Sequence, residues 1–143
     1  ADKFKPEIIW NTEKGLALSA GEIAKAEAAR GALIARVAEF LRHYDLLICP
    51  AAPVPPFDVA QRYVEAIGDT KMDNYIEWIA ITYCITLTAC PALSLPCAFT
   101  SDGLPVGMQL IAANGEEARL LSHASAIEEL FAVATGLPID PCN

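Results

Sequence analysis

The chain has 143 residues, of which 54% are hydrophobic and 20% charged, and this is enough apolar material to bury the core of one domain. Wholesale disorder is therefore excluded. Ten Lys and Arg against 18 Asp and Glu give a net charge of −8, which repels a phosphate backbone, so nucleic acid is not an expected partner. No apolar run reaches the roughly 18 residues of a membrane span, and no signal-peptide pattern is present, so no membrane association is expected.

The cysteine and histidine content argues against a disulfide framework and against a metal site. The five cysteines are odd in number and form no C-x-x-C pair, which is typical of reduced thiols and of a cytoplasmic protein. Neither His43 nor His123 stands at zinc-like spacing from a cysteine, so we expect no metal and no cofactor. The first residue is Ala1 rather than Met, so we expect a chain that was processed or cut from a longer protein.

The N-terminal third predicts a lead-in, a long helix and a strand. Residues 1–18 are polar and predict an irregular segment. Ser19 and Glu22 form a capping-box pattern at the start of a helix over 20–43, whose apolar positions recur every three or four residues. The short apolar run over 45–50, which ends in proline, predicts a buried strand.

The middle of the chain predicts a loop followed by an apolar helix. Prolines at 50, 53, 55 and 56 exclude a regular helix or a central strand, and we expect residues 50–72 to form the most mobile part of the molecule. Asn74 and Glu77 form a second capping-box pattern and predict a helix over 74–87. This helix is apolar nearly all round, which is typical of a helix inside a protein.

A β-hairpin is predicted over 92–111. Its first strand lies within 91–100, where Pro96 favours a sheet edge or a bulge, and its second strand covers 106–111. Gly107 indicates that another backbone passes close to the second strand. The side chain of Gln109 is expected to bond backbone groups in an apolar setting.

The last predicted element is a helix. Asn114 and Glu117 form a third capping-box pattern at its start, and Gly136 and Pro138 mark its end. The resulting order is helix, strand, loop, helix, strand, strand, helix. It predicts an α/β fold, a small mixed sheet flanked by helices, formed by residues 1–143 as a single unit.

Three segments, in this order, resemble the C-terminal part of the amidase signature family. The first is YDLLICP over 44–50, similar to the family's D-x-L-x-x-P strand. The second is TLTACPALSLPC over 86–97, similar to its N-x-x-G-x-P-A-x-S-x-P stretch, and the third is DGLPVGMQLI over 102–111, similar to its D-G-x-P-x-G-x-Q-x-I hairpin. The resemblance covers about residues 20–132. It implies that this unit is one edge of a larger sheet.

The chain departs from the family pattern at three positions. Thr86 stands where the family usually has Asn, and Ala89 and Ala98 stand where it usually has Gly. These departures affect the local geometry of a helix end and a strand.

The resemblance also implies a reaction, the hydrolysis of a small carboxylic amide, not a peptide, to an acid and ammonia or an amine. The family's nucleophilic serine is activated by a second serine in a cis peptide and by a lysine, and the serine pair lies in a Gly-rich segment. No two serines are adjacent here, and the last lysine is Lys71. The serines are Ser19, Ser94, Ser101, Ser122 and Ser125. We therefore expect the catalytic residues upstream, none in this chain, and no amidase activity from it alone, because loss of a nucleophile costs on the order of 10⁶ in turnover.

In the family the helix before the second segment packs beside the active-site channel. Tyr75, Trp78, Thr82 and Thr86 share one face of this predicted helix, and we expect them to line the substrate pocket, with Trp78 and Thr82 on the acyl side. Ordinary core packing of the same stripe is the alternative. Ile79 stands where amidotransferase-like members often carry an acidic residue, which favours a general amidase over a glutamyl-tRNA amidotransferase A-like subunit.

Three further hypotheses concern function and assembly. A stand-alone, non-catalytic interaction module with this sub-fold is the alternative to an amidase portion. A thiol–imidazole pair of Cys97 and His123 has no support from the spacing of these residues. Exposed apolar surface and unpaired strand edges predict self-association as a dimer that covers the apolar helix or a sheet edge.

Overall fold

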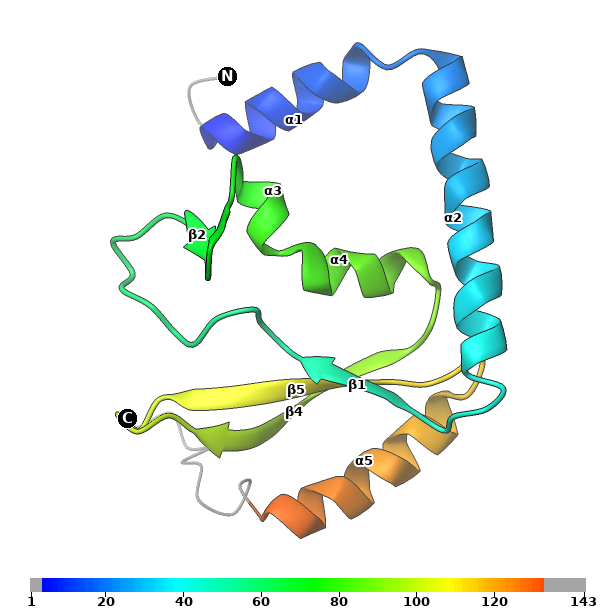
Figure 1. Cartoon of the computed structure of the whole chain (residues 1–143), viewed down its shortest axis with the longest axis vertical. Helices are drawn as coiled ribbons and strands as arrows, with labels where there is room; N and C mark the ends of the chain where they lie inside the picture. Colours follow the sequence, from blue (N-terminus) through cyan, green and yellow to red (C-terminus); the bar gives the residue numbers. More distant parts are fainter. Residues whose placement is uncertain (1–3, 133–143) are drawn as a thin grey trace.

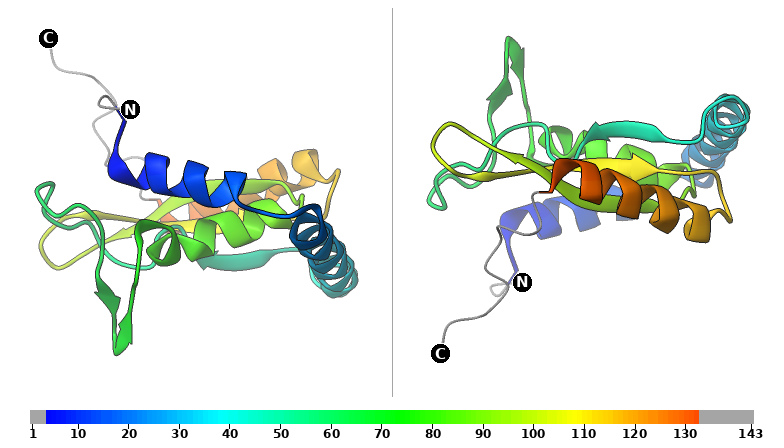
Figure 2. Two further views of the ribbon diagram at one scale, coloured as in Figure 1. Left: turned by 90° about the horizontal axis from the view of Figure 1, so that it is seen from above. Right: turned by 90° about the horizontal axis from the view of Figure 1, so that it is seen from below.

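Helices surround a three-stranded sheet in the computed structural model, which describes residues 4–132 (Figure 1). α5 lies on one face of the sheet, and α1, α3 and α4 lie beyond the opposite face (Figures 1 and 2). The elements, in chain order, are α1 (Pro6–Leu16), α2 (Ala20–Phe40), β1 (Leu47–Pro50), β2 (Ala66–Ile67), β3 (Thr70–Lys71), α3 (Tyr75–Trp78), α4 (Ala80–Leu87), β4 (Ala92–Phe99), β5 (Pro105–Ile111) and α5 (Glu117–Phe131).

The sheet has the order β1-β5-β4, and every pairing in it is antiparallel. The α/β architecture is confirmed, but the expectation of a mixed sheet is wrong, because β1 also runs antiparallel to β5. The hairpin over 92–111 is confirmed, with β4 at the sheet edge and a register shift between Pro96 and Ala98. Proline has no N–H to donate to the ladder, which explains the edge position and the irregularity.

The core lies between the sheet and α5. Its buried residues are Leu95, Leu110, Ala112, Leu120 and Ala124. A Cβ atom on Gly107 would lie 3.3 Å from Cβ of Ala51, which confirms that a neighbouring chain segment passes close. Nε2 of Gln109 donates a hydrogen bond to the carbonyl oxygen of Pro50 at 3.1 Å, as expected for a buried amide among apolar residues.

The predicted irregular lead-in is wrong, because α1 occupies most of it. Proline stands in the first turn of α1, Glu7 also lies there, and Lys14 lies in the last turn. Each of these features stabilises a helix at that end. The capping box of Ser19 and Glu22 is confirmed at the start of α2, which ends at Phe40, three residues before the predicted end.

The predicted helix over 74–87 is divided into α3 and α4 at Ile79, whose φ of −92° and ψ of 13° are not helical. The capping box at Asn74 forms only in part. Its side chain accepts a hydrogen bond from the N–H of Ile76, but the Glu77 carboxylate accepts from the N–H of Asp73. The expected burial is also wrong, since no residue of α4 is buried.

The segment 50–72 contains more structure than a loop. β2 and β3 form a short antiparallel hairpin, with Gly68 at a φ of 56° in its turn, and Val64 is buried. The mobility of this segment stays a prediction. Within residues 4–132, no helix is both long and apolar enough to cross a membrane.

The third predicted capping box is wrong. Asn114 does not cap α5, whose N-cap is Glu116 without a side-chain hydrogen bond. α5 ends at Phe131, where Ala132 adopts a left-handed conformation with φ of 51°. The predicted end markers Gly136 and Pro138 lie outside the described residues.

Candidate functional site

A row of aromatic rings holds residues 50–72, here called the Pro-rich segment, against α3. The rings of Tyr63 and Tyr75 meet edge to face with centroids 6.3 Å apart, and Tyr75 meets Trp78 in the same way at 6.1 Å. Trp78 then meets Phe57 at 5.6 Å with an interplanar angle of 79°. Edge-to-face contacts at these distances are favourable, so the four rings hold α3 to two points of the segment before it.

Trp78 lines a cavity of about 190 Å³ between α3, the Pro-rich segment and β5. No charged side chain of residues 4–132 lines it. Its walls include Pro55, Pro56, Phe57, Pro105 and Gly107. The indole Nε1 of Trp78 is buried and has no hydrogen-bond partner among the described residues. An uncharged, Pro-rich and aromatic lining suits an apolar group.

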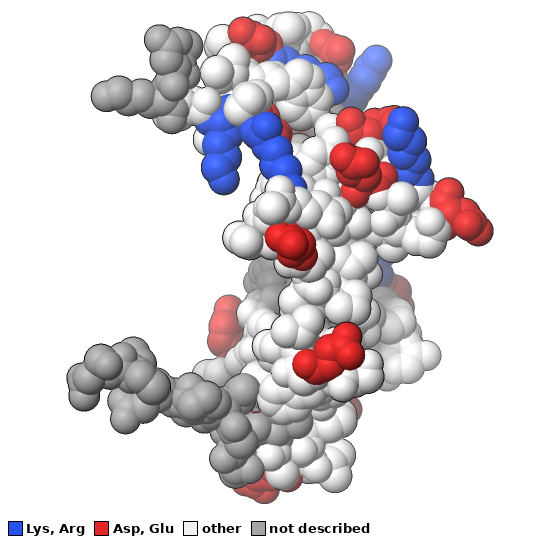
Figure 3. All heavy atoms as spheres, turned by 90° about the vertical axis from the view of Figure 1, so that its left-hand side faces the viewer, with Lys and Arg blue, Asp and Glu red and all other residues white. Residues whose placement is uncertain are grey.

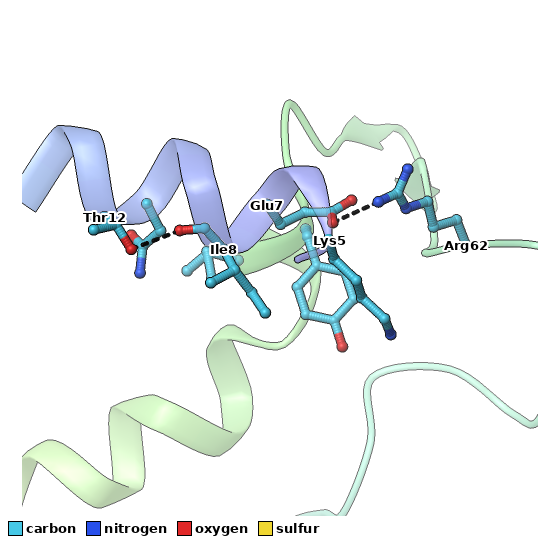
Figure 4. A pocket seen from close by; sticks show the side chains of 8 residues that line it. Lys5, Glu7, Ile8, Thr12 and Arg62 are labelled. Carbon is cyan, nitrogen blue, oxygen red and sulfur yellow. Dashed lines mark hydrogen bonds and ion pairs between the residues drawn. The ribbon is translucent and has the colours of Figure 1, made fainter. Parts of the chain in front are cut away.

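A second cavity, of about 360 Å³, lies between α1 and α3, and Tyr75 lines it (Figure 4). It combines apolar surface with charged side chains. Lys5, Glu7 and Arg62 line it, and Nη2 of Arg62 lies 2.6 Å from Oε2 of Glu7. The two aromatic rings of α3 therefore line different cavities. Tyr75 lines the cavity with charged side chains, and Trp78 lines the apolar one.

Thr82 and Thr86 lie on α4, away from both of these cavities. The hydroxyl of Thr82 donates to the carbonyl oxygen of Ile79 at 2.7 Å, and that of Thr86 donates to the carbonyl oxygen of Thr82 at 3.5 Å. The break at Ile79 thus separates the four predicted pocket residues into two pairs. Thr82 and Thr86 are exposed, whereas Tyr75 and Trp78 are half-buried.

Sequence reasoning missed Phe57 and Tyr63. Both stand in a segment that we interpreted as a loop, and only the fold brings them to α3. Two large aromatic residues within a Pro-rich stretch that we interpreted as a loop were the signal that could have found them, because exposed loops seldom need large apolar rings.

The ionisable groups form neither a thiol–imidazole pair nor a metal cluster in the described part of the chain. The thiol of Cys97 donates to the carbonyl oxygen of Val106 at 3.5 Å, and no hydrogen bond joins it to His123, whose Nε2 is buried and unpaired. Burial raises the pKa of the Cys49 thiol above 9.0. Between residues 4 and 132, the four cysteines are free and no group of three or more His, Cys, Asp or Glu could hold a metal ion.

Comparisons with known proteins identify relatives along nearly the whole chain. The family model described as Amidase matches residues 1–121. The chain is 39% identical over 107 residues to a glutamyl-tRNA(Gln) amidotransferase subunit from Prosthecochloris aestuarii, a match that covers 73% of this chain and 20% of that protein. It is 29% identical over 142 residues to an acylamidase of Rhodococcus erythropolis, which covers 97% of this chain and 28% of that protein.

Solved structures agree with this relationship. A crystal structure of an amidase matches with a TM-score of 0.79 and 30% identity, over 91% of this chain and 30% of that one. A bacterial aryl acylamidase of the amidase signature enzymes matches with the same TM-score and 20% identity, over 96% of this chain and 30% of that one, which shows the fold. The chain therefore spans less than a third of the length of these relatives.

Proposed function

The chain belongs to the amidase family, and from this premise we propose that it forms the C-terminal portion of an amide hydrolase. The reaction is the hydrolysis of a small carboxylic amide to an acid and ammonia or an amine. The observation that carries the proposal is the family match over residues 1–121. The name of the matched acylamidase supports this class of substrate.

The catalytic groups of this proposal lie outside the chain. The resemblance implies a serine pair in a Gly-rich segment and a lysine, and no two serines are adjacent in these 143 residues. The chain alone is then inactive, and its role is to build one wall of the substrate pocket. No metal or cofactor takes part in this proposal.

We propose that Trp78 and the apolar cavity beside it receive the acyl part of the substrate. The uncharged lining supports this placement, because an acyl chain is apolar. Tyr75 supports the Trp78 ring by contact. Thr82 and Thr86 extend the wall along α4 if the substrate passes over the exposed outer face of that helix.

A second candidate is a glutamyl-tRNA amidotransferase A-like subunit. The 39% identity to a protein of that name favours it. Ile79 argues for the general amidase, since an apolar residue there provides no carboxylate to hold a substrate amine. An assay of the full-length enzyme tests the first candidate directly, because a general amidase hydrolyses simple aryl or aliphatic amides.

We also propose that the protein is cytoplasmic and that this chain self-associates as a dimer, which covers the apolar helical segment 74–87 or a sheet edge. The four free cysteines of the described part support a reducing compartment. Tyr83 and Leu87 of α4 are 37% and 40% exposed, which leaves an apolar helix face in water. A monodisperse monomer in light scattering would contradict the dimer.

The pocket is tested with Trp78→Ala in the full-length enzyme. The ratio of kcat/KM values for a bulky and a small acyl amide should change by about tenfold, because side-chain volume sets acyl preference. The matched control is Trp10→Ala, on α1 and 38% exposed, which should leave the ratio unchanged. If Trp78→Ala lowers the melting temperature and reduces both kcat/KM values equally, Trp78 is a core residue and the pocket assignment is wrong.

A further inference from the structure

The cavity between α1 and α3 holds polar groups that the described residues leave unpaired. Its cationic Arg62 is matched by Glu7, and the Thr12 hydroxyl donates to the carbonyl oxygen of Ile8. Lys5 and Tyr75, in contrast, make no side-chain hydrogen bond or ion pair within residues 4–132. We propose that this cavity binds a small organic carboxylate, which accepts from the Lys5 ammonium and the Tyr75 hydroxyl. The inference does not depend on the proposed function.

The charges around the cavity favour a single negative group. Two cations, Lys5 and Arg62, and one carboxylate, Glu7, line it, so the net lining charge is 2 − 1 = +1. The Lys5 side chain runs away from the Glu7–Arg62 pair (Figure 4), which leaves its ammonium free for another anion. Figure 3 shows Lys and Arg in the upper part of the molecule, with Asp and Glu among them.

The net charge of −8 does not prevent anion binding at this position. Charges separated by more than about 8 Å are largely screened at physiological ionic strength, so the groups within the cavity dominate. A hydrogen bond between an ammonium and a carboxylate is about twice as strong as a neutral one. Lys5 is therefore expected to supply most of the affinity, and the neutral Tyr75 hydroxyl the smaller part.

The remaining walls suit the body of the ligand. Ile8 and Ile76 provide apolar surface next to the polar groups. The volume of about 360 Å³ lies within the range of small-molecule sites in proteins. The ligand class is thus a carboxylate attached to a small aryl or alkyl group.

Trp78 provides a built-in reporter for this cavity. Its ring touches that of Tyr75 at a centroid distance of 6.1 Å, while the ring itself lines the other cavity. A ligand that bonds the Tyr75 hydroxyl should therefore shift the indole N–H resonance of Trp78 without contacting it.

The experiment is a titration of this chain with sodium benzoate at constant ionic strength, followed by ¹H–¹⁵N NMR. Saturable shifts are expected in α1, α3 and the Trp78 indole N–H. Benzamide, which has the same ring without the charge, should bind about tenfold or more weakly. Shifts that are not saturable, or equal affinity for benzamide, would overturn the proposal.

Two variants separate the contributions of Lys5 and Tyr75 to benzoate affinity, and a third controls for the loss of one positive charge. Lys5→Met should weaken benzoate binding by about tenfold or more, and Tyr75→Phe, which keeps the ring contacts, by about fivefold. Lys14→Met removes a positive charge from the last turn of α1, where Lys14 lies over Trp10, and should leave the affinity unchanged. Equal losses in Lys5→Met and Lys14→Met would overturn the site. Unchanged shifts of the β4–β5 amides verify that each variant is folded.

Discussion

The side-chain amide of Asn114 donates a hydrogen bond to the carbonyl oxygen of Ala89 over 2.5 Å, although the two residues are 25 positions apart. Ala89 follows α4 with a φ of 59°, in the left-handed region. A residue with a Cβ atom is unfavourable there by roughly 1–2 kcal/mol. The hydrogen bond from Asn114 thus stabilises a strained turn between α4 and β4. Ala89, in this turn, stands where the family usually has glycine.

Ala89→Gly is expected to stabilise the chain by about 0.5–1 kcal/mol, because relief of the left-handed strain exceeds the added entropy of the unfolded chain. Urea unfolding measures the change. The matched control is Ala35→Gly, the same substitution at an exposed position of α2, which should destabilise by about 0.5–1 kcal/mol. A loss of stability in Ala89→Gly similar to the control would show that the turn is unstrained.

Gly107→Ala is expected to destabilise the chain by about 1–3 kcal/mol, because the added Cβ would lie 3.3 Å from Cβ of Ala51 and 3.4 Å from the carbonyl oxygen of Leu95. Backbone atoms of β4 cannot move aside without disturbing the hairpin. Gly31→Ala is the control, since nothing lies within 4 Å of a Cβ there and Ala is the better helix former, so it should stabilise. Thermal unfolding of both variants measures the two changes in stability. A Gly107→Ala variant as stable as wild type would mean that β1 and β4 adjust freely.

The elements that could be predicted from the sequence are those fixed by local chemistry. Ser19 with Glu22 begins α2, and Pro96 with Gly107 marks the edge and the close approach in the hairpin. α1 was predictable as well, since proline and acid at its start and Lys14 at its end are helix signals, but its polar composition suggested an irregular segment.

The candidate site was predictable only in part, because its geometry depends on contacts between distant segments. The periodicity of 74–87 identified Tyr75 and Trp78, yet it contains no sign of the break at Ile79 that separates them from α4. Phe57 joins the site only through the ring contact with Trp78. Likewise, Asn114 resembled a helix cap in sequence, whereas in the fold its amide bonds the turn after α4.

The capping box of α2 predicts a pH dependence of stability. Two hydrogen bonds lower the pKa of the Glu22 carboxyl below its ordinary value. The larger effect comes from the Ser19 hydroxyl and the smaller from the Ser19 N–H. A carboxyl with a lowered pKa in the folded state stabilises that state above the ordinary value, and the contribution disappears as the pH falls through the folded-state pKa. Wild type should therefore be more stable than Glu22→Gln at pH 7, and the difference should shrink on acidification below pH 4.5.

Urea unfolding from pH 3 to pH 7 measures this difference. Ser19→Ala removes the hydroxyl partner, so Glu22→Gln should have a smaller effect in that background. A difference between wild type and Glu22→Gln that stays constant down to pH 3 would show that the carboxylate makes no charge-dependent contribution to α2.

The thiols of Cys49 and Cys84 should differ in reactivity. Cys84 is exposed on α4, whereas Cys49 is half-buried on β1, its pKa is raised by burial, and Nε2 of Gln109 lies 3.6 Å from its Sγ. Because the thiolate is the reactive form, Cys84 should react with an aromatic disulfide reagent at pH 8 roughly tenfold faster than Cys49. Stopped-flow absorbance resolves the phases, and Cys84→Ser should remove a fast phase while Cys49→Ser removes a slow one. In denaturant the two rates should converge, since the difference comes from burial. A Cys49 thiol that reacts as fast as Cys84 in the native protein would show that β1 opens readily from β5.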